Sequence, residues 1–167
     1  DNIIFCFNKF DCTIILNKVF ILHAIIHILL FKIKFSAMSD KVKYEMEFPI
    51  QVSPSLLYQY ISTPSGLSEW FADNVNSRGE LFTFMWEGSE EEAKLLSKKA
   101  DDRIKLRWTE DEEEGLNYFF EMKIQVDEIT KDVSLMITDF AEEGEEDEGK
   151  MLWDNMVSGL KQILGSS

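Results

Sequence analysis

The side chains that most often carry catalysis are confined to the first part of this sequence. Both histidines, His23 and His27, and both cysteines, Cys6 and Cys12, lie within residues 1–37. Residues 38–167 contain neither type, so nucleophilic or acid–base chemistry there would depend on carboxylates without an imidazole or thiol. The sequence has no phosphate-binding, dinucleotide-binding or serine-hydrolase motif. We therefore predict no catalytic residue, no metal site and no cofactor, and an enzyme is not indicated.

Large apolar side chains at alternating positions are the main chemical feature of residues 38–167. An apolar–polar alternation indicates half-buried strands. It covers residues 42–52, 80–87, 104–108, 118–126 and 133–140, and more weakly residues 72–76 and 93–99. Short polar segments connect most of these runs, including turns expected at residues 77–79 and 99–102 and a loop at residues 110–115. This order predicts an antiparallel meander.

The inward-facing side chains of these strands could line a pocket for an apolar ligand or could fill an ordinary core. Asp139 is the one polar residue of inward parity on the last strand, where it would lie at a cavity mouth or begin a loop. The candidate ligand-binding residues are Trp70, Phe84, Trp86, Trp108, Phe120, Met122, Asp139, Trp153, Met156 and Leu160.

Helices are expected before and after most of the strands. Ser53 and Pro54 are typical of a helix start, and Thr63 with Pro64 ends that helix and begins a second one over residues 65–71. A longer helix is predicted over residues 150–164, with Gly159 where its backbone would approach the sheet. Its apolar stripe contains Leu152, Trp153, Met156, Val157, Leu160, Ile163 and Leu164.

The sequence is strongly acidic, with 31 acidic and 17 basic residues and a formal net charge of −14. A surface of this sign repels phosphate backbones, so we expect no nucleic-acid partner. Three acidic runs, residues 87–92, 110–114 and 142–148, fall at alternate connections of the meander and should lie at one end of the sheet. We interpret them as solvated loops, with docking to a basic protein surface as the alternative.

Residues 1–37 differ from the rest in composition, with no glutamate, glycine or proline. Their apolar run, residues 19–31, is short for a membrane-spanning helix, and lysines follow it where a signal peptide would carry small residues. We predict a disordered extension, or upstream sequence foreign to the native protein, followed by one domain at residues 38–167. We expect no stable membrane insertion and a cytoplasmic location.

Several short motifs occur in an order typical of one superfamily. They are Trp70 with Phe71, residues 78–84 (RGELFTF), residues 106–108 (LRW) and residues 152–156 (LWDNM). Through them the chain resembles the START-like (Bet v 1-like, helix-grip) superfamily, and within it the family named after the activator of Hsp90 ATPase. The resemblance covers about residues 40–165. It implies an α+β helix-grip fold, in which a curved antiparallel sheet wraps around a long C-terminal helix and leaves an elongated apolar cavity.

The resemblance does not imply one function, because such folds host lipid carriers, enzymes and co-chaperone modules. We expect a non-catalytic domain, monomeric or weakly dimeric, that holds an apolar small molecule or lipid between sheet and helix. The alternative is a co-chaperone-like interaction module that docks through its acidic end. No catalytic residue is carried over from the family, because residues 38–167 lack histidine.

Overall fold

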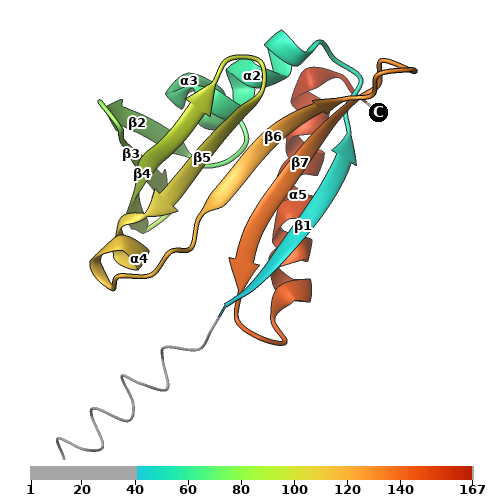
Figure 1. Ribbon diagram of the computed structural model, residues 1–167. Coiled ribbons are helices and arrows are strands. Elements are labelled where there is room, and N and C mark those ends of the chain that lie inside the picture. The colour runs from blue at the N-terminus through green and yellow to red at the C-terminus, as the bar shows by residue number, and fades with distance from the viewer. Residues whose placement is uncertain (1–40, 167) are drawn as a thin grey trace, which may run out of the picture. The chain divides into compact units, whose positions relative to one another are not determined.

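One antiparallel sheet dominates residues 41–166, the part of the chain that the computed structural model describes (Figure 1). The spatial order of its strands is β1-β7-β6-β5-β4-β3-β2, so every neighbour except the β1–β7 pair is consecutive in the chain. The strands are β1 (Val42–Pro49), β2 (Asn74–Arg78), β3 (Leu81–Trp86), β4 (Ser89–Lys99), β5 (Arg103–Trp108), β6 (Phe120–Val126) and β7 (Val133–Ala141). This arrangement confirms the predicted α+β helix-grip meander.

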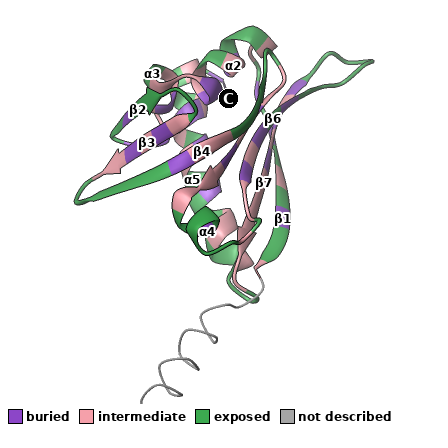
Figure 2. Ribbon diagram, turned by 60° about the vertical axis from the view of Figure 1, so that its left-hand side comes forward, coloured by how far each residue is buried: buried purple, intermediate pink, exposed green. Residues whose placement is uncertain are grey.

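The inner face of the sheet is covered by helices. In Figure 1, α5 (Glu146–Leu164) runs behind β1 and β7, which it contacts, and α2 (Pro54–Ser62) contacts β5 and β6. Figure 2 shows buried positions alternating with less buried ones along the strands, as in β3 and β6. The apolar side of each strand therefore faces the helices, and the polar side faces solvent.

Local sequence signals explain the turns and caps. The Glu87–Gly88 turn joins β3 to β4 directly, since Trp86 pairs with Ser89, and Gly88 adopts a φ of 87°. Tight hairpin turns need such left-handed residues, which glycine supplies without steric cost. The hydroxyl of Ser53 accepts the Leu56 N–H at the start of α2, as expected for an N-cap.

Two helices differ from the prediction in length. The second short helix, α3 (Pro64–Leu67), ends before Phe71, and the chain continues in turns held by the Phe71 N–H to Leu67 C=O bond of 2.8 Å. The last helix begins at Glu146, four residues before the predicted start. Acidic side chains in its first turn favour a helix N-terminus, and this effect extends the helix beyond its apolar stripe.

Three predicted connections are also corrected. Residues 110–115 are not an open loop but contain α4 (Thr109–Glu113), whose Asp111 is buried. Residues 77 and 78 belong to β2, because they pair with Phe82 and Leu81. The acidic residues 90–92, with Ser89 before them, extend β4, where pairing with β3 outweighs their low strand propensity.

The apolar stripe of α5 is narrower than predicted. Trp153, Val157 and Leu160 are buried, whereas the side chains of Leu152 and Ile163 are 59% and 42% exposed. At 100° per residue, Leu152 and Ile163 lie at the margin of the stripe defined by the other three.

Two further expectations concern the N-terminal extension and membrane insertion. The predicted extension at residues 1–37 lies outside the described residues. Within residues 41–166, no helix is both long and apolar enough to cross a membrane.

Candidate functional site: a cavity between the sheet and the C-terminal helix

A cavity of about 350 Å³ lies between one end of the inner sheet face and the first half of α5. Its wall is mainly apolar and is built from the ends of five strands, one loop and one helix. The lining residues are Phe71, Trp86, Ser89, Glu91, Trp108, Phe120, Asp139, Leu152, Trp153 and Met156.

Packed aromatic rings form the floor of this cavity. The centroid of the Phe71 ring lies 5.9 Å from that of Phe120 and 5.7 Å from that of Trp153. The Trp108 ring stacks on Phe120 at 4.9 Å. Such edge and offset contacts hold rings in fixed orientations, so the wall is preformed.

Six of the ten predicted site residues line the cavity, and the structure brings them together from four strands and α5. They are Trp86, Trp108, Phe120, Asp139, Trp153 and Met156. Whether these side chains bind a ligand stays a prediction.

The other four predicted residues do not line the cavity. Phe84, Met122 and Leu160 are fully buried in the core, because neighbouring side chains cover them on every side. The indole of Trp70 points toward α2, where its Nε1–H donates to the carbonyl of Tyr60 at 3.1 Å. These residues support the wall rather than form it.

Sequence reasoning missed Phe71, which is at the centre of the aromatic cluster. It follows Trp70 directly, and the choice between them depends on how the chain turns after α3. Tyr44 was also missed. Its inward parity on β1 was visible, but its position opposite Asp139 follows only from the pairing of β1 with β7.

Asp139 is the polar centre of the site. Its Oδ2 accepts hydrogen bonds from the Trp153 indole N–H at 2.9 Å and from the Tyr44 hydroxyl at 3.3 Å. Its Oδ1 accepts from the backbone N–H of Phe140 at 2.8 Å. All three donors are neutral, and within residues 41–166 Asp139 forms no ion pair.

Burial controls the electrostatics of this group. Loss of solvent raises the pKa of the Asp139 carboxyl, while the hydrogen bonds from Trp153, Phe140 and Tyr44 act in the opposite direction. Burial, followed by the nearby charge of Asp139, raises the pKa of the Tyr44 phenol far above its usual value. Tyr44 therefore stays protonated and keeps donating its hydrogen bond.

Of the two glycines in α5, Gly149 approaches a sheet side chain, and not Gly159 as predicted. A Cβ atom at Gly149 would lie 2.6 Å from the Tyr44 hydroxyl oxygen, whereas one at Gly159 would meet nothing within 4 Å. The missing side chain at Gly149 thus lets the helix pass over Tyr44 while that residue bonds to Asp139.

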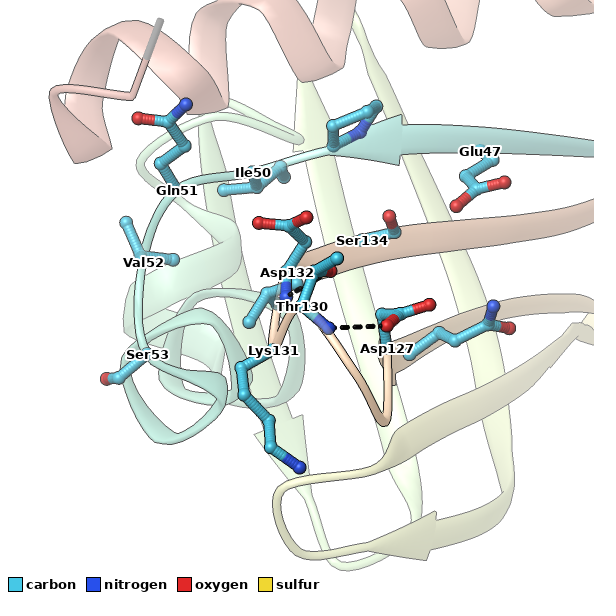
Figure 3. Close-up of a pocket in the computed structure, with 13 residues that line it drawn as sticks. Glu47, Ile50, Gln51, Val52, Ser53, Asp127, Thr130, Lys131, Asp132 and Ser134 are labelled. Carbon is cyan, nitrogen blue, oxygen red and sulfur yellow. Dashed lines mark hydrogen bonds between the residues drawn. The ribbon is translucent and has the colours of Figure 1, made fainter.

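A larger hollow of about 950 Å³ lies elsewhere, between the segment after β1 and the β6–β7 turn (Figure 3). Its lining is mainly polar, and the Asp127 carboxylate there already accepts the N–H groups of Ile129 and Thr130, each at 2.8 Å. It lacks the converging apolar walls of a small-molecule site, so its size does not make it the better candidate.

The acidic runs gather at one end of the sheet. Glu90, Glu91, Glu92 and Glu110 line a hollow of about 330 Å³ together with Lys41, which pairs with Asp111 at 3.1 Å. The third run follows Ala141, which pairs with Val42 next to Lys41. Lys98 and Lys99 lie at the opposite end, in the β4–β5 hairpin. No cluster suitable for a metal ion occurs in the described part of the chain.

Comparison with solved structures identifies proteins of the same fold. The NMR structure of BfR322 from Bacteroides fragilis is 36% identical, with coverage of 76% of this chain and 93% of that chain and a TM-score of 0.55. The Aha1 dimer from Colwellia psychrerythraea is 17% identical, with coverage of 74% and 96% and a TM-score of 0.63. ChR145 from Cytophaga hutchinsonii is 16% identical, with coverage of 77% and 97% and a TM-score of 0.58. The last two show similarity of fold alone.

Comparison of sequences assigns the family. No curated protein sequence matches this chain. The family described as a START-like superfamily domain matches residues 38–166, nearly the whole of the region that carries the motifs above. That match, with the related Bacteroides protein, shows that the chain belongs to the START-like superfamily.

Proposed function

We propose that this protein is a non-catalytic binding domain that holds one apolar small molecule or lipid between its sheet and α5. The observation that carries the proposal is the cavity itself, with aromatic walls around a single buried carboxylate, that of Asp139. START-like domains as a class bind hydrophobic ligands or proteins, and the cavity favours the first kind of partner.

The size and lining of the cavity suit a small ligand. A volume of about 350 Å³ lies near the lower end of the range of roughly 300–1,000 Å³ found for small-molecule sites. Each Å² of apolar ligand surface that moves from water to such a wall contributes roughly 25 cal/mol of favourable free energy to binding. Met156 adds an adaptable side chain to the otherwise rigid aromatic wall.

The groups on the wall favour binding over catalysis. Asp139 is engaged by three donors, and Glu91 is an exposed residue at the rim. Ser89 is the one hydroxyl side chain on the described cavity wall, and it forms no hydrogen bond with a carboxylate there. Covalent catalysis needs a nucleophile hydrogen-bonded to its general base.

Native mass spectrometry of the purified full-length chain tests this proposal. We expect an adduct with the mass of an apolar metabolite or lipid, present on the folded protein and lost on unfolding. The adduct should also be lost from Met156→Trp, because the larger side chain fills the cavity, but kept by Met151→Trp on the exposed side of α5. Equal adducts on both variants would place the ligand elsewhere and contradict the proposal.

A second candidate function uses the acidic end. The carboxylates of Glu90, Glu91, Glu92 and Glu110 lie around one hollow and present a concentrated negative charge. This arrangement supports docking to a basic protein surface, as in a co-chaperone-like module. Such binding should weaken sharply as the salt concentration rises from roughly 50 to roughly 500 mM, because salt screens interactions between exposed charges. Ligand binding in the cavity should not change.

A further inference from the structure

Among residues 41–166, no cationic side chain pairs with the Asp139 carboxylate, although this group lies at the wall of an apolar cavity. Its three hydrogen-bond donors, on Trp153, Tyr44 and Phe140, are all neutral. Lys41 influences it only through space, because the Lys41 ammonium is paired with Asp111 at 3.1 Å. An ionised carboxylate that is removed from water is costly unless an opposite charge compensates it.

The remaining wall is suited to a positive charge. Trp86, Trp108, Phe71 and Phe120 surround the same cavity, and aromatic ring faces attract cations. Glu91 at the rim adds a second negative group. An ionised carboxylate has about four acceptor positions. The described residues use three of those of Asp139, which leaves one for a donor from the ligand.

We propose that the ligand is an amphipathic cation, in which a protonated amine on a hydrophobic body is held by Asp139 and surrounded by aromatic rings. This inference rests on the proposed function and specifies its ligand class. The amine supplies both the missing counter-charge and an N–H donor, while the hydrophobic body fills the rest of the cavity.

Other head groups fit the wall less well. A fatty-acid carboxylate would face Asp139 and Glu91, and like charges in a site of low polarity repel strongly. A neutral alcohol could donate one hydrogen bond, but it would leave the charge of Asp139 uncompensated. The wall therefore selects amine over alcohol, and alcohol over acid.

Calorimetric titration of the full-length protein with three probes of equal chain length tests this selectivity. The probes are octylammonium, 1-octanol and octanoate. We expect octylammonium to bind at least tenfold more tightly than octanol, and octanoate to bind most weakly. Equal affinity for the three probes would overturn the inference but leave the proposed function standing. Failure of all three to bind would overturn both.

Two substitutions assign the selectivity to one residue. Asp139→Asn removes the buried charge and should reduce the preference for the amine over the alcohol to less than threefold. Asp154→Asn makes the same change of charge on the exposed side of α5 and should keep the full preference. A preference that survives in Asp139→Asn would contradict the inference. If Asp139→Asn does not fold, the wild-type titrations still decide the matter through the ranking of the three probes.

Discussion

The Trp153 indole on α5 donates a 2.9 Å hydrogen bond to the Asp139 carboxylate on β7, at the wall of the cavity. The same oxygen accepts the Tyr44 hydroxyl from β1. One carboxylate thereby connects the long helix to both strands beneath it. We expect the position of α5, and with it the width of the cavity, to depend on this connection.

Replacing Trp153 by Phe tests how much the connection stabilises the fold. The variant keeps an aromatic ring but removes the N–H, so Asp139 loses one of its donors. We expect the free energy of unfolding to fall by about 1–3 kcal/mol, the usual cost of leaving a buried polar group with too few partners. Urea denaturation followed by circular dichroism measures this change.

Trp108→Phe is the matched control for this substitution. Trp108 lies on the same cavity wall, but its indole N–H forms no hydrogen bond among the described residues. Trp108→Phe should lower the free energy of unfolding clearly less than Trp153→Phe does. Equal costs would mean that ring volume, and not the bond to Asp139, accounts for the effect.

Gly149 should tolerate no side chain. A Cβ atom there would lie 2.6 Å from the Tyr44 hydroxyl oxygen, which the bond to Asp139 holds in place. We expect Gly149→Ala to lower the free energy of unfolding by about 1–3 kcal/mol, as overpacking usually does. Thermal and urea unfolding of the variant provide the measurement.

Gly159→Ala, on the same helix, should have the opposite effect. Its Cβ atom would meet nothing within 4 Å, so the higher helix propensity of alanine should add up to about 1 kcal/mol to the free energy of unfolding.

Addition of Tyr44→Phe should relieve part of the loss of stability caused by Gly149→Ala, because the hydroxyl that causes the clash is gone. A stabilising Gly149→Ala would show that α5 does not approach Tyr44 as described.

The buried carboxylate predicts a pH dependence of stability with a definite sign. Burial raises the pKa of Asp139, so the folded protein binds this proton more tightly than the unfolded chain does. Stability from this group is therefore greatest at acidic pH and decreases as the pH rises from the ordinary carboxyl value of about 3.9 through the raised pKa. The variant Asp139→Asn keeps the side chains that influence the pKa of Asp139, namely Lys41, Tyr44 and Trp153.

The difference in unfolding free energy between Asp139→Asn and the wild type isolates this contribution. The titration of the other carboxylates contributes equally to both proteins and cancels in this difference. The variant should therefore become more stable relative to the wild type as the pH rises from about 4 to 7. Urea denaturation at a series of pH values gives the curve. A shift in the opposite direction would show that the hydrogen bonds outweigh burial and lower the pKa of Asp139.

Much of the fold could be predicted because local patterns and global structure agree. The alternation of Tyr44, Met46 and Phe48 identified the inner face of β1, and Ser53 with Pro54 marked the start of α2. Residues 90–92 could not be assigned to β4 in this way, since three consecutive glutamates carry no apolar signal and only the pairing with β3 orders them.

The site was harder to predict than the fold. Period-two parity places Phe84 and Trp86 on the same face of β3, yet only Trp86 reaches the cavity, because the first is covered by other rings. Parity gives the face of the sheet on which a side chain lies, but not whether other side chains cover it there. Similarly, the contact of Gly149 with Tyr44 depends on where α5 crosses β1, which no residue of either element indicates alone.

A fluorescence titration with the apolar probe N-phenyl-1-naphthylamine tests directly whether a ligand binds between the sheet and α5. The titration compares the wild type with Met156→Trp, which fills the cavity, and with Met151→Trp, whose position on α5 is 64% exposed. We expect the wild type and Met151→Trp to bind the probe with the same affinity, and Met156→Trp to bind it at least tenfold more weakly. Equal binding by all three proteins, or no binding to the folded wild type, would contradict a ligand site between the sheet and α5.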